Sequence, residues 1–299
     1  MRMNMTARAH RIANALLFSS ALALTATASA TPNYFQGFES NTGDWQASLG
    51  ISRTPAGGGT LHLAPSGGSY YAELKNLPDG YQSPGFGDGG YSFYGGADST
   101  YHGAFFQAID VYINAHWAPP PGYPTLPGFW IDMTPYHADI NNYGAEHNFQ
   151  ITALGSAVQV SVDGQSTPIA TLTNSGWYTF VMTYRRAPLL GDPVITDMSV
   201  YAPNHSLMGT TTVTATSPGG PFASADLRGN GYVWITAWQN GFANDVLGLD
   251  NQRTGLLPFR PVPRSKDECK DGGWQSMARL DNSSFKNQGD CIQYANTGR

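Results

Sequence analysis

Apolar and polar residues alternate with a period of two along much of residues 101–251. In residues 105–114, the odd-numbered positions are apolar except for Gln107, whereas the even-numbered positions mix apolar residues with Asp110. This period predicts a β-strand with one face more apolar than the other. The same alternation recurs in residues 157–172, 177–184, 194–201, 210–216 and 231–238.

Turn signals separate these segments, and Asp163-Gly164 is typical of a tight β-hairpin. No long amphipathic helical pattern follows residue 30. Short strands rich in β-branched and aromatic residues, with turns between them, favour an antiparallel β-sandwich or jelly roll. We therefore predict an all-β domain over residues 31–256, which is long enough to bury one core.

Three segments interrupt the alternation. Residues 76–100 are rich in Gly and Tyr, and residues 114–128 contain five prolines, so both are predicted to be loops. Long loops on a rigid sandwich are common positions for ligand binding. Residues 257–265 contain three further prolines and are predicted to be a semi-rigid linker to a C-terminal segment, residues 266–299.

The first 30 residues have the organisation of a signal peptide, with a basic start, an apolar run and small residues up to Ala30. We expect cleavage after Ala30 and a secreted or periplasmic protein. The removed segment contains three arginines and no acidic residue, so the net charge falls from −5 to −8. An acidic chain of this kind has no electrostatic footprint for nucleic acid or anionic lipid. No later segment approaches the roughly 20 apolar residues of a membrane span, so we expect neither a nucleic-acid partner nor membrane insertion.

Cys269 and Cys291 are the only two cysteines, and they lie 22 positions apart in the C-terminal segment. In an oxidising compartment two such residues pair, which predicts a disulfide. The alternatives are free thiols or a metal site, but residues 260–299 contain no histidine that would complete a metal site. We expect the stapled segment, residues 266–299, to be a small unit of its own, in which Trp274 and Phe285 pack across the disulfide.

Several segments resemble a known family: FQGFESNTGDW at residues 35–45, SGWYTF at 175–180 and VLGLDN at 246–251. They are similar to an uncharacterised group of secreted bacterial proteins with a concanavalin A-like, laminin G-like jelly roll. SKDECKDGGWQS and FKNQGDC resemble a short C-terminal module that is attached to many secreted bacterial proteins. The resemblance implies a twisted sandwich whose first and last strands pair near the chain ends. It brings no catalytic residues to any position of this chain.

The acidic residues give little support for sugar hydrolysis, which needs two carboxyl groups about 5 to 9.5 Å apart. The chain has four Glu, and no strand carries closely alternating acids. Asp110 and Asp132 lie on separate strand-like segments and could converge. A polysaccharide lyase needs a base beside a group that neutralises charge, and His137, Tyr136 and Arg185 could fill these roles. Histidines bonded to loop backbone are the simpler interpretation.

Calcium is the ion that the sequence favours. Glu39 and Asp250 lie near the two ends of the sandwich domain, on strands that this fold tends to pair, and hard oxygen ligands suit Ca²⁺. The alternative is that Glu39 caps a turn and Asp250 accepts hydrogen bonds from backbone amides. We expect no other cofactor.

Aromatic residues gather in and beside the two long loops. Flat rings with polar edges stack on the faces of sugar rings, while Asn, Gln and Asp bond the hydroxyl groups. Phe129 and Trp130 are expected to be core residues, and the candidate ligand-binding residues are Trp117, Tyr123, Tyr136, Tyr91 and Tyr94.

Charged residues make up only 12% of the chain, against roughly 25% in an average soluble domain. We therefore expect a secreted, non-catalytic binding protein for a polysaccharide or cell-envelope surface. The alternatives are a polysaccharide lyase or glycoside hydrolase, and a structural coat or matrix protein. The sequence does not indicate an oligomeric state.

Overall fold

The structure of the 299-residue chain is a computed structural model. It describes residues 35–43, 45–47, 50–75, 89–94, 105–118, 128–137, 148–162, 165–185, 195–214, 216–217, 220–221, 227–239, 246–279 and 283–298. The predicted signal peptide lies outside these residues.

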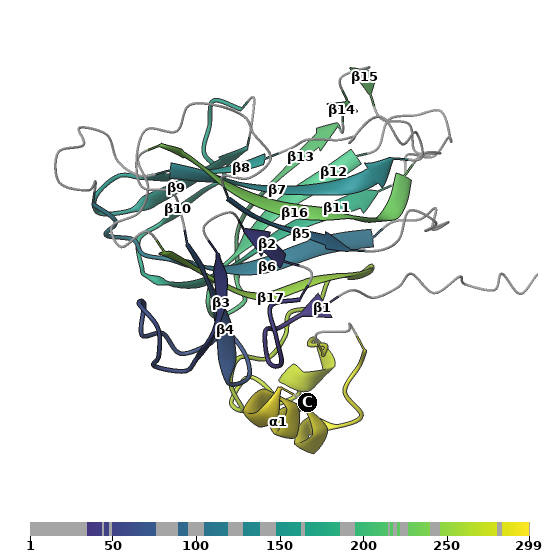
Figure 1. Cartoon of the computed structure of the whole chain (residues 1–299). Coiled ribbons are helices and arrows are strands. Elements are labelled where there is room, and N and C mark those ends of the chain that lie inside the picture. Colours follow the sequence, from purple (N-terminus) through teal and green to yellow (C-terminus); the bar gives the residue numbers. More distant parts are fainter. Residues whose placement is uncertain are drawn as a thin grey trace, which may run out of the picture.

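Two antiparallel sheets are stacked face to face, so the predicted all-β sandwich is confirmed (Figure 1). The eight-stranded sheet has the order β13 (Leu207–Thr214), β12 (Ile195–Tyr201), β11 (Gly176–Arg185), β6 (Phe105–Ile113), β17 (Val246–Leu256), β4 (Tyr70–Lys75) and β3 (Ile51–Pro55), with β1 (Phe35–Gln36) also paired to β17. The seven-stranded sheet has the order β10 (Ala170–Leu172), β9 (Val158–Val162), β8 (Asn148–Ala153), β7 (Gly128–His137), β16 (Leu227–Gln239), β5 (Gly89–Tyr94) and β2 (Trp45–Ala47). A small hairpin joins β14 (Thr216–Ser217) and β15 (Gly220–Pro221).

The ends of the sandwich domain meet in one sheet. β1 pairs with β17, with Phe35 opposite Arg253 and Gln36 opposite Gln252. The pairing of the first and last strands, which the family resemblance implied, is therefore confirmed.

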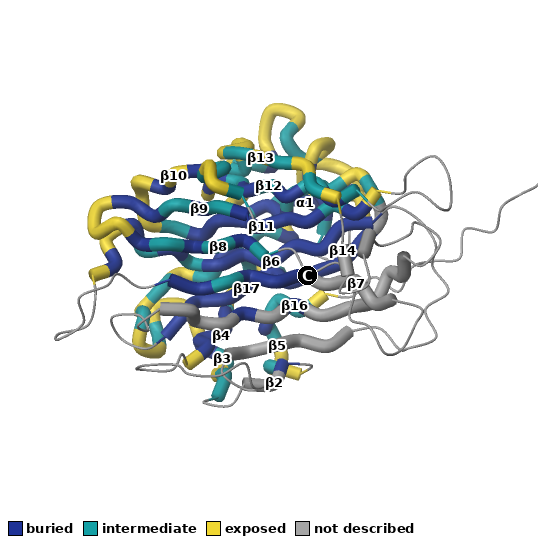
Figure 2. The backbone as a smooth tube through the Cα atoms, turned by 90° about the horizontal axis from the view of Figure 1, so that it is seen from above, coloured by how far each residue is buried: buried dark blue, intermediate teal, exposed yellow. Residues whose placement is uncertain are grey.

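The core lies between the sheets and follows the predicted alternation. Ile109 and Val111 of β6 face Ile131 of β7, Phe149 of β8 and Val160 of β9 in one cluster of fully buried side chains. The intervening positions of β8 and β9 are only partly buried, because they point away from the core. Figure 2 shows the burial concentrated along the central strands β11, β6 and β17, with exposed residues at the loops.

One strand is more buried than its sequence pattern predicts. Eight of the nine residues of β6 are buried, on both faces of the sheet. The outer face carries Phe106 and Ala108, which cluster with Val181 and with Leu257 and Phe259 from the segment after β17. The C-terminal part of the chain therefore covers the outer face of this sheet.

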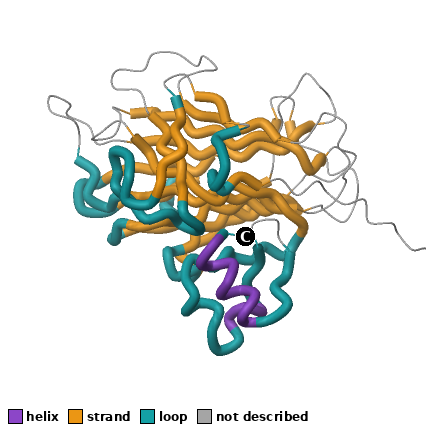
Figure 3. Tube along the Cα trace, turned by 60° about the horizontal axis from the view of Figure 1, so that its bottom comes forward, coloured by secondary structure: helices purple, strands orange, loops and turns teal. Residues whose placement is uncertain are grey.

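The C-terminal unit, defined as residues 257–279 and 283–298, lies beneath the eight-stranded sheet, on the side away from the seven-stranded sheet (Figures 1 and 3). It contains a 3-10 turn, η2 (Gly273–Gln275), and the helix α1 (Gln288–Thr297). The side chain of Asn287 caps α1 by accepting a hydrogen bond from the amide of Asp290.

The predicted disulfide between Cys269 and Cys291 is present, with the Cα atoms 5.8 Å apart. Both cysteines are fully buried in a second small core with Val262, Met277, Phe285 and Tyr294. Trp274 packs against this core, so the two aromatic residues expected to pack beside the disulfide do so.

Part of the predicted loop over residues 76–100 is a strand. Residues 89–94, inside the segment predicted to be a loop, form strand β5 between β16 and β2. Their glycines hide the strand pattern, and the backbone pairing with both neighbours supplies the order. β9 and β10 pair as antiparallel neighbours, and the turn predicted at Asp163-Gly164 lies outside the described residues. Within the described ranges no helix has the length and apolar character needed to span a membrane.

Candidate functional site

A β-bulge in β17 builds a polar cluster on the outer face of the eight-stranded sheet. Asp250 pairs with Asp110 of β6, whereas the next pairing joins Arg253 to Ala108, so β17 contains one extra residue. Asn251 takes up this extra length with a left-handed φ of 47°. The bulge lets Asp250, Asn251 and Arg253 all reach the side of the sheet that carries Asp110.

Asp110 is the centre of this cluster. Its buried carboxylate accepts hydrogen bonds from Thr179 Oγ1 at 2.5 Å, from Asn251 Nδ2 at 3.0 Å and from the Ser66 hydroxyl. Arg264 Nη2 lies 3.3 Å from its Oδ2 atom. Burial alone would raise the pKa of Asp110, but the positive charge of Arg264 and the two hydroxyl donors outweigh it, so the pKa is lowered.

The pKa of Asp250, the register partner of Asp110, is shifted in the opposite direction. Its Oδ2 accepts the backbone N–H groups of Ser66 at 2.9 Å and Gly67 at 3.1 Å, and its Oδ1 accepts that of Asn251 at 2.8 Å. Complete burial and the negative charge of Asp110 nevertheless raise the pKa of Asp250 well above its ordinary value. The structure therefore brings together an acid pair that the sequence did not predict.

Arg264 of the C-terminal unit covers this acid pair. Its guanidinium donates to Thr179 Oγ1 at 2.8 Å, to Ser66 Oγ at 2.9 Å and to the carbonyls of Ala202 at 3.2 Å and Pro203 at 2.8 Å. Its side chain is only 10% exposed. One planar group thus joins β11, the segment before β4 and the turn after β12, a use that suits the rigid fork of an arginine.

A second buried arginine lies beside it. Arg253 donates to the carbonyl of Arg260 at 3.0 Å, and its guanidinium lies 5.1 Å from the ring centre of Phe259 and 6.0 Å from that of Phe106. Burial lowers the pKa of Arg253 to about 10, an effect that the negative charge of Asp110 partly offsets. Both arginines therefore link the sheet to the C-terminal unit.

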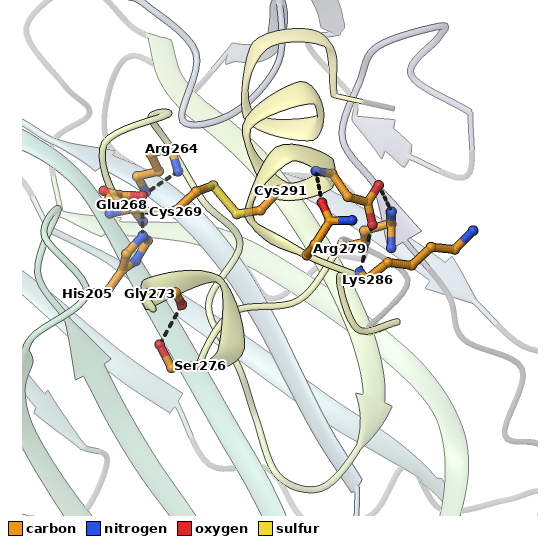
Figure 4. The surroundings of a disulfide bond; sticks show 11 residues. His205, Arg264, Glu268, Cys269, Gly273, Ser276, Arg279, Lys286 and Cys291 are labelled. Carbon is orange, nitrogen blue, oxygen red and sulfur yellow. Dashed lines mark hydrogen bonds and ion pairs between the residues drawn. A yellow bond between two sulfur atoms is a disulfide. The ribbon is translucent and has the colours of Figure 1, made fainter. Parts of the chain in front are cut away.

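The C-terminal unit also contacts the sandwich on both sides of the two arginines. Glu268 Oε2 lies 3.1 Å from His205 Nε2 and accepts the backbone N–H of Arg264 at 2.7 Å (Figure 4). At the other end, Gly298 ends α1 with a left-handed φ of 69° beside Gly68, so close that a Cβ atom there would lie 3.4 Å from the Gly68 Cα. The predicted linker, residues 257–265, thus packs against the sandwich instead of crossing open solvent.

The outer face of the seven-stranded sheet is the second candidate site. Here polar and aromatic residues are register partners on neighbouring strands. One row across β5, β16, β7 and β8 consists of Tyr91, Trp234, Asp132 and Asn148. The next row consists of Thr236, Trp130, Gln150 and Ser161. We call these two rows the polar-aromatic face.

The exposure of the described side chains fits this arrangement. Trp130, Gln150 and Ser161 are partly exposed, whereas their strand neighbours Phe129 and Ile151 are fully buried. Asp132 is 7% exposed. The expectation that Phe129 is a core residue is confirmed. Trp130 was also expected in the core, but it lies on the opposite face of the strand and is partly exposed to solvent.

Of the five predicted ligand-binding aromatics, Trp117 lies in the core. Trp117 is only 7% exposed and packs edge to face against Phe129, 5.9 Å between ring centres, so its ring belongs to the core. Tyr91 is the register partner of Trp234, in the first row of the polar-aromatic face. Tyr94 is the register partner of Gly231, which belongs to neither of the two rows. Tyr136 belongs to β7, and the predicted site residue Tyr123 lies outside the described residues.

The residues considered for catalysis are separated by the fold. Tyr136 and His137 belong to β7 of the seven-stranded sheet. Arg185 belongs to β11 of the other sheet, where its Nε and Nη2 bond both carboxylate oxygens of Asp197 at 2.5 and 2.8 Å. Asp110 and Asp132 also lie on different sheets, with the core between them, so they form no acid pair.

The predicted calcium ligands, Glu39 and Asp250, both accept N–H groups from residues 66–70. Glu39 Oε1 accepts the N–H groups of Ser69 at 2.8 Å and Tyr70 at 3.0 Å, while its negative charge contributes to the raised pKa of Asp250. A cavity of about 20 Å³ is lined by Glu39 and Asn251 but not by Asp250. Hard oxygen atoms are therefore present, although N–H groups already bond several of them. Within the described ranges no three His, Cys, Asp or Glu side chains are grouped as a metal site.

Sequence reasoning missed Arg264, Ser66 and Thr179 as members of the buried cluster. The available signal was Asp110 itself, because a lone acid on a strand whose other face is apolar requires a partner when it is covered. Nothing in the local sequence indicated that this partner lies more than 150 residues further on.

The class that this fold defines is an antiparallel β-sandwich with a docked, disulfide-bonded C-terminal unit. No protein-family model matches the sequence. No curated protein matches it either.

Solved structures with a similar arrangement include two carbohydrate-active enzymes and a toxin domain. The marine PL-14 alginate lyase from Aplysia kurodai is 12% identical with a TM-score of 0.34, and the match covers 73% of this chain and 90% of the lyase. The endo-1,3-beta-glucanase from Streptomyces sioyaensis is 13% identical with a TM-score of 0.35, over 75% of this chain and 96% of the glucanase. The binding domain of botulinum neurotoxin serotype G is 10% identical with a TM-score of 0.31, over 75% of this chain and 48% of the toxin domain.

Proposed function

We propose that the protein is exported and binds a polysaccharide or cell-envelope glycan through the polar-aromatic face of its seven-stranded sheet, without cleaving it. The observation that carries this proposal is the register of the two rows, which puts tryptophan positions next to amide and hydroxyl positions on neighbouring strands. An aromatic ring stacks on the apolar face of a sugar ring, and amides bond its hydroxyl groups.

The absence of catalysis is proposed from the acids of the same face. In the two described rows Asp132 is the only carboxylate, and hydrolysis of a glycosidic bond normally needs two. The acid pair that the fold does form, Asp110 and Asp250, lies beneath the C-terminal unit and is bonded by N–H donors and Arg264. It is closed to a polymer.

The test is retention of the mature protein on insoluble polysaccharides, supported by a glycan array. We expect retention on at least one glycan and a clear loss for Trp130→Ala. The matched control is Phe35→Ala, which removes an aromatic ring that is 51% exposed on β1 of the other sheet. Absence of retention on every glycan, or equal retention of both variants, would overturn the proposal.

The enzymatic alternative is distinguished with the same panel of soluble polysaccharides. Hydrolysis would release reducing ends, and lyase activity would add the ultraviolet absorbance of an unsaturated product. We expect neither. Activity that is lost in Asp132→Asn would identify the polar-aromatic face as an active site instead. Self-association without any glycan binding would favour the structural coat or matrix protein.

We also propose that Glu39 and Asp250 hold a structural Ca²⁺ ion. The support is that both carboxylates accept backbone N–H groups of one segment, residues 66–70, and that the negative charge of Glu39 contributes to the raised pKa of Asp250. A bound cation would offset this negative charge. The ion would tie the two chain ends of the sandwich together. Its role would be stability and not chemistry.

A further inference from the structure

A polar groove runs between the sandwich and the C-terminal unit, away from the polar-aromatic face. The sandwich contributes Glu39, Arg53 and Tyr70 to its lining, and α1 contributes Gln293, Asn296 and Thr297. Its volume is about 740 Å³, within the range of roughly 300 to 1,000 Å³ that is typical of small-molecule sites. The groove exists only because the C-terminal unit is docked on the sheet.

The sandwich wall of the groove is fixed in place. Arg53 donates from Nε to the carbonyl of Phe38 at 2.9 Å and from Nη2 to that of Glu39 at 2.5 Å, and its guanidinium lies 3.1 Å from the ring centre of Tyr70. The Glu39 carboxylate is held through Oε1 by the two backbone N–H groups of the loop before β4. Side chains fixed in this way lose little conformational entropy when a ligand binds.

The same residues keep polar atoms that the protein does not use. Over the part of the chain that the structure describes, Arg53 Nη1, Glu39 Oε2 and the Tyr70 hydroxyl take part in no hydrogen bond. The side-chain amides of Gln293 and Asn296 on the opposite wall also make none within these ranges. The groove therefore presents donors and acceptors from both sides.

The mixture of these groups restricts the ligand. The positive charge of Arg53 and the negative charge of Glu39 lie in one groove, which disfavours a phosphate, a sulfate or another simple anion. Each described side chain that lines the groove carries an amide, a hydroxyl or a charged group, which disfavours a lipid. A sugar hydroxyl both donates and accepts, so a saccharide satisfies all of these groups at once.

We propose that this groove is a second glycan site, which binds a pyranose oligosaccharide between Arg53 and Glu39 on one wall and Gln293 and Asn296 on the other. The site lies on the opposite side of the sandwich from the polar-aromatic face and does not depend on it. Two sites on opposite sides of one molecule would let it bridge two glycan chains, which raises the avidity for a polymer.

The test uses the ¹⁵N-labelled full mature chain and NMR spectroscopy. The probes are cellohexaose, laminarihexaose, xylohexaose, mannohexaose and a mannuronate hexamer, with inorganic sulfate as an anion control. The single variants Gln293→Ala and Asn296→Ala assign the two side-chain amide resonances by their disappearance. Both residues are exposed on α1, and alanine supports a helix, so the backbone spectrum should be unchanged.

We expect at least one hexasaccharide to shift both amide resonances, and the double variant to bind it about tenfold more weakly or worse, as the loss of two hydrogen bonds implies. Gln275→Ala, which removes an exposed amide elsewhere in the C-terminal unit, should bind normally, and so should Trp130→Ala. The proposal is overturned when no hexasaccharide shifts the amides, when only sulfate does, or when the double variant binds as well as the wild type. A hexasaccharide that shifts the two amide resonances in the wild type but not in Trp130→Ala would assign the binding to the polar-aromatic face and overturn the groove.

Discussion

The guanidinium of Arg264 lies 3.3 Å from the carboxylate of Asp110, although the two residues belong to the C-terminal unit and to the central strand of the sheet. Their side chains are 10% and 5% exposed. A buried ion pair is a weak source of net stability, because both charges lose their hydration. Loss of either partner would leave the other charge buried and uncompensated, which favours the docked arrangement. The pair therefore fixes where the C-terminal unit docks.

Arg264→Met should destabilise the protein substantially. The variant leaves Asp110 buried without its cation, and removal of one partner of a buried pair costs roughly 3 to 5 kcal/mol. Urea unfolding followed by far-ultraviolet circular dichroism measures this change in the free energy of unfolding.

The matched control for this variant is Lys270→Met. It breaks an ion pair with Asp267 in which the side chains are 48% and 71% exposed, and we expect no measurable loss. A similar effect of the two variants would show that burial of the Arg264 pair has no energetic consequence.

Glu268 should make the docking sensitive to acid. Burial alone would raise its pKa, but the hydrogen bond with His205 and the backbone N–H groups of Arg264 and Ser265 outweigh it, so the pKa is lowered. A carboxyl group whose pKa is lower in the folded than in the unfolded state stabilises the protein at pH values above its ordinary pKa. This contribution disappears as the pH falls through the lowered value.

The free energy of unfolding of Glu268→Gln should accordingly fall short of the wild type at pH 6, and by less at pH values near 3.5. Urea unfolding at both pH values measures the two differences. The result that contradicts the assignment is a deficit that stays the same, or grows, in acid.

Much of the sandwich could be predicted from the sequence because the central strands have one face in the core. The alternation in β6, β8 and β9 reports that face directly, since each second residue contacts the opposite sheet. Strand β5 was not predicted, because it is ordered by backbone pairing with β16 and β2, which leaves no trace in the local sequence. Gly89 and Gly90 offer no side chain that could reveal such pairing.

The sites were harder to predict, since both depend on contacts between distant segments. Period-two alternation cannot show that Phe259 and Arg264 cover the outer face of β6. Trp117 was predicted to bind a ligand because it lies in a proline-rich segment, but Phe129 provides an apolar surface for its ring. The local sequence shows which chemical groups these residues carry, but not which distant residues they contact.

The proposed calcium ion should stabilise the sandwich. We expect the unfolding midpoint of the mature protein to rise by several degrees in millimolar Ca²⁺ relative to EDTA, since a bound ion stabilises only the folded state. Mg²⁺ should have a smaller effect, because it demands a near-ideal octahedron of ligands. Scanning calorimetry measures all three midpoints.

Glu39→Gln keeps the size of the side chain and removes its charge, so the difference between Ca²⁺ and EDTA should disappear in this variant. Glu73→Gln is the control, because Glu73 also accepts backbone N–H groups, those of Thr60 and Leu61. Identical unfolding midpoints of the wild type in Ca²⁺ and EDTA would show that the protein binds no stabilising calcium ion.

Loss of the disulfide should loosen the C-terminal unit in part only. A cross-link that closes a loop of 22 positions stabilises by about 3 kcal/mol, so the double variant Cys269→Ala, Cys291→Ala should open between these residues. Arg264 precedes Cys269, and its bonds to Ser66 and Thr179 do not pass through the disulfide. The anchor should therefore stay docked while the rest of the unit opens.

Limited trypsin digestion with mass spectrometry resolves the two parts. In the double variant we expect rapid cleavage after Arg279 and Lys286, which lie between the cysteines, and continued protection of Arg253 and Arg264, which are held against the sheet. The oxidised wild type should resist cleavage at all four positions. Equal cleavage at Arg264 and Lys286 in the double variant would mean that the disulfide, and not the buried arginine, holds the C-terminal unit on the sandwich.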